Sequence, residues 1–378
     1  MLDTIETPAL ILDEHRLDTN IKNMRKRLNT AGVEFRPHLK TCKSLDIANR
    51  ILPPTEGSKI TVSTLAEAEY FLKGGYRDIL YAVSIAPNKL KRVKALQEAG
   101  ANMTLLLDTL VAAKQISEAG QKMGTTFPCF IEIDCDGKRA GLKPDDTAVL
   151  EIAKLLNEAS GVDLSGVMTH SGGSYYCKST DEIYEVAEKE RLAITQAATA
   201  IREQGIKCAV VSAGSTPTAT YTYSTDGITE IRAGVYVFQD MVMQALGVCQ
   251  TDDIAISVLS TVISHNSAHN RLLIDAGSLA LSADPGLKNE KGQTHFGQVC
   301  EIENTKVVEG LFVSSTNQEH GLISLAGTNH SLDDFPIGSQ LRILPNHACI
   351  TAAAYPGYHV ISSETGDISA YWPRHNGW

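Results

Sequence analysis

One lysine of the chain stands where it could bond covalently to a cofactor. Lys40 follows Pro37-His38-Leu39, directly after an apolar run at residues 33–36. A lysine that is withdrawn from water becomes a neutral amine more readily, and a neutral amine can form a Schiff base with an aldehyde. Most lysines are solvated surface groups, however, and Lys43 follows shortly after Lys40. The spacing alone does not decide between these two lysines.

A polar segment further along the chain has the groups that bind a phosphate. The segment Gly214-Ser215-Thr216-Pro217-Thr218 offers backbone N–H groups, hydroxyls and a flexible glycine at an expected helix N-terminus. Gly234 and Tyr236 lie in the next loop, so two neighbouring loops could supply donors to one anion. The same residues would also suit an ordinary capped turn. Both interpretations, a phosphate site and a helix cap, stay open at this point.

A third segment pairs two metal-ligating residue types. His347 and Cys349 alternate in LPNHAC, and in an extended segment alternate side chains point to the same side, so imidazole and thiolate could share one metal ion. These ligand types suit zinc, and two protein ligands would leave coordination positions for water or substrate. A buried cysteine beside a hydrogen-bonded histidine is the alternative. The nearby cluster Asn317-Gln318-Glu319-His320 could support such a metal or form a polar turn, and we favour the turn.

The elements that must position these residues alternate regularly up to about residue 233. Short β-type runs are followed in most cases by segments with apolar residues at helical spacing, which predicts a (β/α)8 barrel. A doubly wound dinucleotide fold would need a glycine-rich turn after its first strand, where this chain has PHLKTCKS. In a barrel the chemistry lies at the C-terminal ends of the strands, and the candidate segments follow such runs. The runs lie at 33–36, 59–63, 78–82, 103–107, 129–133, 162–169, 208–212 and 228–231.

The alternation of β-type and helical segments ends at about Asp252. β-type runs separated by turn residues continue to the C-terminus, with no segment of convincing helical length. The opening run at 7–12 is also strand-like and could join them. We therefore expect a barrel domain over residues 13–252 and an all-β domain over 253–378 together with 1–12.

Composition limits the class of protein. The 378 residues include 43% hydrophobic and 21% charged side chains, typical of globular domains, and the net charge of −10 argues against a nucleic-acid surface. The start lacks a positive n-region and its apolar run stops at Asp13, so we expect neither a signal peptide nor a membrane span. Eight scattered cysteines without a CxxC pair are typical of reduced thiols, which predicts a cytoplasmic protein.

Six segments together resemble a known enzyme family, the fold-type III pyridoxal-phosphate enzymes with an alanine racemase-like barrel. Within it they are similar to the group of D-serine dehydratases, D-threonine aldolases and D-threo-3-hydroxyaspartate dehydratases. The resemblance extends from about Thr7 to the C-terminus, and its order along the chain makes it specific. The segments are PHLKTCKS, DGKRAG, THSGGSY, SAGSTPT, RAGVYVF and LPNHAC.

The resemblance implies a role for each matching residue. Lys40 would hold pyridoxal phosphate and take the α-proton of the substrate, while Arg139 and His170 would lie beside the cofactor ring. His347 and Cys349 would bind a divalent metal, zinc by ligand type, with manganese or magnesium as alternatives. The aldolase branch typically has aspartate at the second position, so Cys349 places the chain nearer the dehydratases. The phosphate cradle would consist of Gly214, Ser215, Thr216, Gly234 and Tyr236, with Tyr175 as a weaker candidate.

The activity implied by the resemblance is that of a lyase on D-3-hydroxy amino acids. We expect a dehydratase that converts D-serine or D-threo-3-hydroxyaspartate to a 2-oxo acid and ammonia, working as a homodimer with no nucleic-acid or membrane partner. The metal would promote loss of the 3-hydroxyl, which requires the β-domain to fold over the barrel mouth. The alternatives are a D-threonine aldolase, an amino-acid racemase of the same fold type, and a cofactor-binding protein without turnover.

Overall fold

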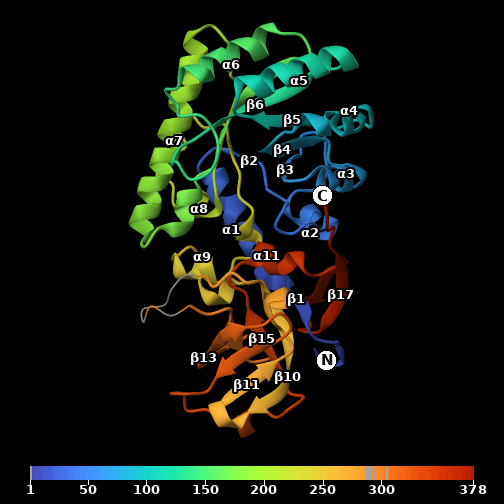
Figure 1. Ribbon diagram of the computed structural model, residues 1–378, viewed down its shortest axis with the longest axis vertical. Coiled ribbons are helices and arrows are strands. Elements are labelled where there is room, and N and C mark those ends of the chain that lie inside the picture. The colour runs from blue at the N-terminus through green and yellow to red at the C-terminus, as the bar shows by residue number, and fades with distance from the viewer. Residues whose placement is uncertain (1, 287–291, 293, 304) are drawn as a thin grey trace. The chain divides into compact units, whose positions relative to one another are not determined.

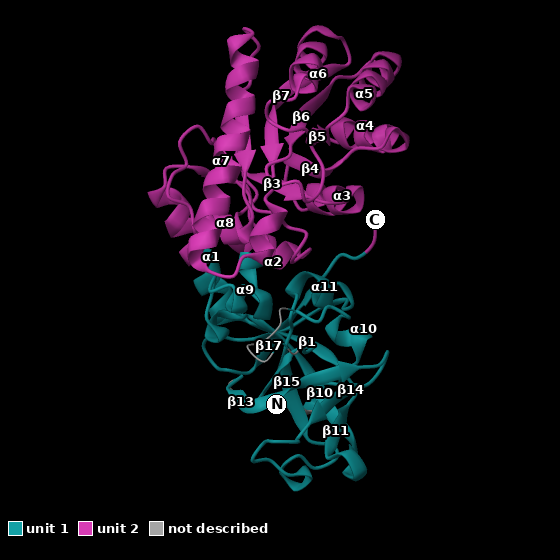
Figure 2. Cartoon of the chain, turned by 60° about the vertical axis from the view of Figure 1, so that its left-hand side comes forward, with its two compact units in different colours: residues 1–22, 235–376 teal, residues 23–234, 377–378 magenta. Residues whose placement is uncertain are grey.

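The computed structural model describes residues 2–286, 292, 294–303 and 305–378. Its contacts divide the chain into two compact units (Figure 2). One unit comprises residues 23–234 with 377–378, and the other comprises 1–22 with 235–376. The domain boundary expected from the sequence, after Asp252, lies later in the chain than the division after Gly234. Helix α1 (Glu14–Thr30) begins in one unit and ends in the other.

The unit of residues 23–234 contains a closed parallel sheet. Its eight strands follow the order β2-β9-β8-β7-β6-β5-β4-β3 within the described residues, and a parallel bridge between His38 and Thr61 joins the two ends. The predicted (β/α)8 barrel is therefore confirmed. The strands are β2 (Glu34–Phe35), β3 (Lys59–Val62), β4 (Asp78–Ser84), β5 (Asn102–Leu107), β6 (Phe127–Ile133), β7 (Val162–Thr169), β8 (Val210–Ala213) and β9 (Glu230–Ile231).

Helices connect successive strands, and Figure 2 shows α3 to α7 along the outer side of the sheet. Their N-termini are capped by side chains, as where Thr64 accepts from the N–H of Glu67 and Ser179 accepts from that of Glu182. Gly124 ends α5 in the left-handed region that glycine tolerates. The helices are α2 (Leu45–Ile51), α3 (Leu65–Lys73), α4 (Leu90–Glu98), α5 (Leu110–Met123), α6 (Thr147–Glu158), α7 (Thr180–Glu203) and α8 (Thr216–Thr220).

A buried ion cluster supports the barrel where its backbone pairing is shortest. Strands β2 and β9 each have two residues, so few ladder hydrogen bonds join them. Arg36, only 3% exposed, places its Nε 2.9 Å from Glu230 of β9 and its Nη1 2.7 Å from Asp78 of β4. Nη1 also donates to the carbonyl oxygen of Ile60 in β3. One guanidinium thus connects β2 to three other strands.

The other unit contains a nine-stranded sheet in its described residues, ordered β11-β14-β13-β12-β15-β10-β1-β16-β17. A further pairing of β11 with β10 closes part of it into a barrel, and β1 pairs with β16 in parallel whereas its pairing with β10 is antiparallel. This is the expected all-β domain, with strand β1 inside its sheet. The strands are β1 (Ala9–Asp13), β10 (Ile256–Asn266), β11 (Arg271–Ile274), β12 (Gln298–Cys300), β13 (Val307–Thr316), β14 (Gly321–Ser324), β15 (Gln340–Leu344), β16 (Gly357–Ile361) and β17 (Ile368–Pro373).

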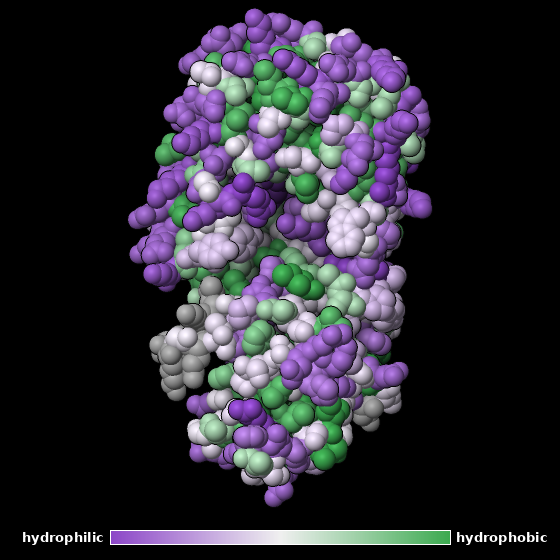
Figure 3. Space-filling view, viewed as in Figure 1, coloured by the Kyte–Doolittle hydropathy of each residue, from purple (hydrophilic) through white to green (hydrophobic). Residues whose placement is uncertain are grey.

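Short helices interrupt this sheet (Figure 1). They are α9 (Met241–Ala245), α10 (Ser278–Leu281) and α11 (Ala348–Ala353), none longer than six residues. The cluster at 317–320 is the turn between β13 and β14, where the N–H of Asn317 donates to the carbonyl oxygen of His320 at 2.8 Å. No helix in the described ranges combines the length and the apolar character needed to cross a membrane. Hydrophilic side chains predominate over the barrel surface seen in Figure 3.

We predict that Arg36→Met destabilises the barrel by about 3–5 kcal/mol, because it leaves the Glu230 carboxylate buried without its cation. The matched control is Arg92→Met. Arg92 also makes a two-bonded pair with a glutamate, Glu69, but both side chains are about 40% exposed, so we expect a loss below about 1 kcal/mol. Urea unfolding followed by circular dichroism measures both, and equal losses would contradict a special role for the buried cluster.

Candidate active site

The C-terminal ends of the barrel strands carry most of the predicted site residues. Lys40 follows β2, Arg139 lies in the loop after β6, and His170 follows β7 directly. Electrostatic effects tie three of them together, because both Arg139 and Lys40 lower the pKa of His170. The rest of the predicted set divides between the units. Tyr175, Gly214, Ser215, Thr216 and Gly234 belong to the barrel unit, whereas Tyr236, His347 and Cys349 belong to the other unit.

His170 is held as a neutral imidazole. Its Nδ1 lies 3.0 Å from the carbonyl oxygen of Gly214, and its ring centroid lies 6.1 Å from that of Tyr175. Burial lowers the pKa of His170 to about 3, and the cations of Arg139 and Lys40 contribute to the shift. A neutral imidazole that faces a carbonyl oxygen through Nδ1 carries its proton there, which leaves the Nε2 lone pair as an acceptor.

Two further charged or titratable residues lie at the same end of the barrel. Burial lowers the pKa of His38 well below its usual range, assisted by Lys40, Arg232 and His170. Arg232, 3% exposed, donates to Ser212 and to the carbonyl oxygen of Thr169. Neither His38 nor Arg232 was in the predicted set. The charged residue at the end of the apolar run before Ala233 was the available signal for Arg232. Arg232 interacts electrostatically with the carboxylates of Glu230, Glu190 and Glu132 as well as with the two histidines.

Lys43 forms an ion pair with a buried carboxylate. Its Nζ lies 3.0 Å from Oε1 of Glu67, a carboxylate that is fully buried. The other oxygen of Glu67 accepts the N–H of Ser63 at 3.0 Å. Because a buried carboxylate needs a compensating cation, Lys43 is required where it lies. The contact assigns Lys43 to the packing between the loop after β2 and helix α3.

The segment at 214–216 forms a capped turn whose donors are engaged within the chain. The N–H of Ser215 donates to Oγ1 of Thr218 at 2.9 Å, and the N–H of Thr218 donates to Oγ of Ser215 at 3.2 Å. The N–H of Gly214 donates to Glu190 at 3.2 Å. Ser215 is thus the N-cap of α8, and the use of the same loops by a phosphate stays a prediction. A phosphate bound here would have to share these donors or use others of the same loops.

Two glycines of the predicted cradle have little space for a side chain. Gly214 has a φ of +120°, and a Cβ there would lie 2.6 Å from the carbonyl oxygen of Arg232. A Cβ on Gly234 would lie 3.0 Å from Oγ1 of Thr41. Glycine is needed at position 214 for its conformation and its close approach to Arg232. A bulky variant at this position would therefore distort the loop itself.

His347 and Cys349 meet in a geometry that differs from the expected one. The segment is not extended: β15 ends at Leu344, His347 is the residue before α11, and Cys349 lies in the first turn of that helix. Even so, the thiol of Cys349 lies close enough to the imidazole to raise the pKa of His347. The extended backbone of His347, with φ −134° and ψ 96°, turns directly into the helix and brings the two side chains together.

Acidic side chains surround this pair. Nδ1 of His347 lies 3.0 Å from Oδ2 of Asp284, and Asp240 accepts the N–H of Ala348 at 3.0 Å. Burial alone would lower the pKa of His347, but Cys349, Asp240 and Asp284 raise it to about 9. Among the described residues no group of three or more histidine, cysteine or acidic side chains is placed to hold a metal. A metal here would thus have His347 and Cys349 as its protein ligands.

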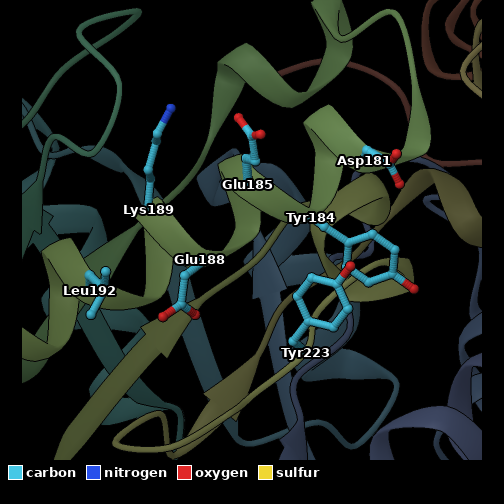
Figure 4. Close-up of a pocket in the computed structure, with 7 residues that line it drawn as sticks. All are labelled: Asp181, Tyr184, Glu185, Glu188, Lys189, Leu192 and Tyr223. Carbon is cyan, nitrogen blue, oxygen red and sulfur yellow. The ribbon is translucent and has the colours of Figure 1, made fainter.

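A separate pocket of about 460 Å³ lies on the surface formed by α7 and the segment after α8 (Figure 4). The rings of Tyr184 and Tyr223 stack at one side of it with centroids 3.9 Å apart. Its lining contains none of the predicted site residues. The residues that line it are Asp181, Tyr184, Glu185, Glu188, Lys189, Leu192 and Tyr223.

Comparison with known families covers nearly the whole chain. Residues 12–241 match the alanine racemase N-terminal domain, and residues 255–361 match a putative serine dehydratase domain. The chain therefore belongs to the alanine racemase N-terminal domain family. The fold and the family together define an enzyme with an alanine racemase-like barrel, and relatives that are named dehydratases and aldolases make it a pyridoxal-phosphate-dependent lyase.

Individual relatives narrow the group within this family. D-threo-3-hydroxyaspartate dehydratase of Delftia sp. (strain HT23) is 43% identical, over 99% of this chain and 98% of that protein. D-serine dehydratase of Dictyostelium discoideum is 33% identical, also over 99% and 98%. The solved metal-free form of a mutant D-threo-3-hydroxyaspartate dehydratase superposes with a TM-score of 0.94 at 42% identity, covering 100% of this chain and 99% of the other.

We predict that His170 stays neutral from about pH 8 to about pH 5. The unfolded chain binds this proton with a pKa near 6.5, whereas the folded chain does not, so acidification favours unfolding. Between about pH 7.5 and about pH 5.5, His170 should lower the free energy of unfolding by about 1 kcal/mol. NMR titration of the histidine-labelled protein, with His170→Gln to assign the resonance, measures the pKa. A resonance that titrates near pH 6.5 would contradict the buried neutral state.

Proposed function

We propose that this chain is a metal-dependent dehydratase of D-3-hydroxy amino acids that forms a 2-oxo acid and ammonia. The observation that carries the proposal is the position of Lys40 directly after strand β2, electrostatically coupled to His38, in a chain similar along its whole length to a D-threo-3-hydroxyaspartate dehydratase. D-threo-3-hydroxyaspartate and D-serine are the preferred substrates. A homodimer is part of the proposal and rests on the sequence resemblance, and a cytoplasmic location rests on the scattered cysteines without a CxxC pair.

The residues at the barrel mouth fit pyridoxal phosphate. The cofactor carries an aldehyde for a lysine and a phosphate dianion for a cationic site. Arg139 and Arg232 would supply positive charge, and the fact that both of them and Lys40 lower the pKa of His170 supports a common site. Lys40 would hold the aldehyde carbon. Arg139 and His170 would lie beside the cofactor ring, and Tyr175 lies next to His170.

The phosphate would lie against the loops after β8 and β9. Gly214, Ser215 and Thr216 supply one loop, and Gly234 begins the other. Tyr236 is proposed as a further donor on the strength of the resemblance. Because Ser215 and Gly214 already donate to Thr218 and Glu190, the loop is ordered before the phosphate arrives. Such preorganisation lowers the cost of binding.

Bound pyridoxal phosphate supplies an electron sink that acidifies the α-proton of an amino acid. Lys40 would accept that proton at Nζ, since its amine is released when the substrate amine takes its place. His170 would stay uncharged, because its pKa of about 3 leaves Nε2 unprotonated at neutral pH, so Nε2 can accept a hydrogen bond but cannot donate one. Its orientation is set by the carbonyl oxygen of Gly214.

The side chains of His347 and Cys349 fit one divalent metal, which we propose to be zinc. The effect of Cys349 on the pKa of His347 supports a common ligand pair, and a thiolate favours zinc over magnesium or manganese. Asp284 at Nδ1 would leave Nε2 of His347 for the metal. A bound metal supplies a Lewis acid for a substrate hydroxyl. That a related dehydratase has a metal-free form supports a metal in the working enzyme.

Two alternatives use the same cofactor. A D-threonine aldolase would break the Cα–Cβ bond and release glycine, and a racemase would exchange the α-proton without a metal. Incubation with D-serine, D-threonine and D-threo-3-hydroxyaspartate, followed by assays for 2-oxo acid, glycine and the L-enantiomer, separates the three. Formation of glycine or of the L-enantiomer as the main product would replace the dehydratase proposal.

We predict that Lys40, and not Lys43, binds the cofactor. Borohydride reduction followed by peptide mapping should place the label on Lys40, and Lys40→Ala should lose the visible absorption band. Lys43→Ala is the matched control, because it removes the cation beside Glu67 and should lower thermal stability while keeping the label. A label on Lys43 would contradict the assignment.

We predict that removal of the metal abolishes dehydration and spares cofactor binding. Chelation, or Cys349→Ala, should lower the rate by about 100-fold or more while the absorption band persists, because only the Lewis acid is lost. Cys300→Ala, which alters a buried cysteine of β12 in the same unit, is the control and should retain metal and rate. Full activity after complete chelation would favour the racemase.

A further inference from the structure

A ring of hydrogen bonds connects the loops after β7 and β8. Oε1 of Glu190 accepts the N–H of Ser171 at 2.8 Å and the N–H of Gly214 at 3.2 Å. His170, the residue before Ser171, contacts the carbonyl oxygen of Gly214 through Nδ1 at 3.0 Å. The contacts therefore form a closed circuit through Glu190, Ser171, His170 and Gly214. Both polar groups of Gly214 are held, its N–H by Glu190 and its C=O by His170.

Glu190 reaches this position from helix α7. It is 3% exposed in the middle of a long helix whose neighbouring side chains, such as Glu188, face solvent. Burial raises the pKa of Glu190, and the side chain of Thr218, the N–H groups of Ser171 and Gly214, and Arg232 oppose the shift. A buried carboxylate that accepts two backbone N–H groups is costly to lose, since each donor would be left without an acceptor.

The backbone at Gly214 depends on this arrangement. Its φ of +120° suits glycine, and its close approach to Arg232 leaves no space for a side chain. A loop with this backbone conformation stays in one conformation only where hydrogen bonds from its surroundings fix its N–H and C=O groups. Glu190 and His170 hold it from opposite sides of the residue, and Ser215 and Thr216 follow it directly.

We propose that Glu190 is a positioning residue for pyridoxal phosphate, holding His170 and the segment 214–216 in a common geometry. The inference rests on the proposed function, because the phosphate and ring belong to that cofactor. Glu190 itself contacts neither group. It acts through the N–H groups of Ser171 and Gly214, which fix the loops on which ring and phosphate would lie.

Three substitutions separate the parts of this role. Glu190→Gln keeps an acceptor oxygen for both N–H groups and should bind the cofactor within about threefold of the wild type. Glu190→Asp keeps the charge but withdraws the acceptor by one methylene, and Glu190→Leu removes the acceptor. We expect affinity for pyridoxal phosphate to fall about tenfold in Glu190→Asp and by more than that in Glu190→Leu. If Glu190→Leu does not fold, Glu190→Asp still decides the outcome.

The measurement compares pyridoxal phosphate with pyridoxal, which lacks the phosphate. Holoenzyme is resolved and titrated with each compound, and the absorption band reports binding. In the wild type the phosphate should strengthen binding strongly, and in Glu190→Asp that advantage should shrink. A loss of packing alone would not change the ratio of the two affinities selectively.

The control for stability is Ile201→Ala, a fully buried position nearer the C-terminal end of α7. It should lower thermal stability while leaving the ratio of affinities unchanged. Equal changes in ratio for Ile201→Ala and Glu190→Asp, or no change in Glu190→Asp, would overturn the positioning role. Failure of the wild type itself to bind pyridoxal phosphate would overturn the proposed function as well, so the two failures are distinguishable.

Discussion

The barrel depends on one buried guanidinium where its backbone pairing is weakest. The two-residue strands β2 and β9 supply few ladder hydrogen bonds, and Arg36 compensates by contacting Glu230, Asp78 and the backbone of β3. Burial lowers the pKa of an arginine, but the two carboxylates more than offset this effect and raise that of Arg36. The loops that carry Lys40 and Gly234 follow these two strands. Their separation is therefore set by an ion cluster beneath them.

Carboxylates link neighbouring loops around the same end of the barrel. Asp108 after β5 accepts the N–H of Gly141, and Asp136 after β6 accepts that of Gly173 at 2.6 Å. Glu190 continues the pattern between the loops after β7 and β8. Loops without regular structure need such acceptors, because their buried N–H groups have no ladder partner. These carboxylates fix long connecting loops that have no regular secondary structure.

The two histidines at this end are polar but uncharged. Burial lowers the pKa values of both histidines, and the cations nearby lower them further because they repel an imidazolium. The positive charge is carried by lysine and arginine, whose charges persist at neutral pH. This division keeps positive charge and neutral hydrogen-bonding rings at one end of the barrel, as the proposed binding of a phosphorylated aromatic cofactor would need.

Much of this protein is determined by its sequence alone, because strand and helix patterns depend on residues near one another in the chain. The eight alternating β-type runs predict the barrel, the change of texture after Asp252 predicts the β-rich part, and the segments around Lys40 and His347 predict the chemistry. Tertiary structure decided the rest. Glu67 gives Lys43 its partner, Glu190 engages the donor of Gly214, and the start of α11 brings Cys349 to His347 by a route that alternation along a strand does not describe. These outcomes depend on side chains distant in sequence, or on where one element stops, and such contacts exist only once the chain has folded.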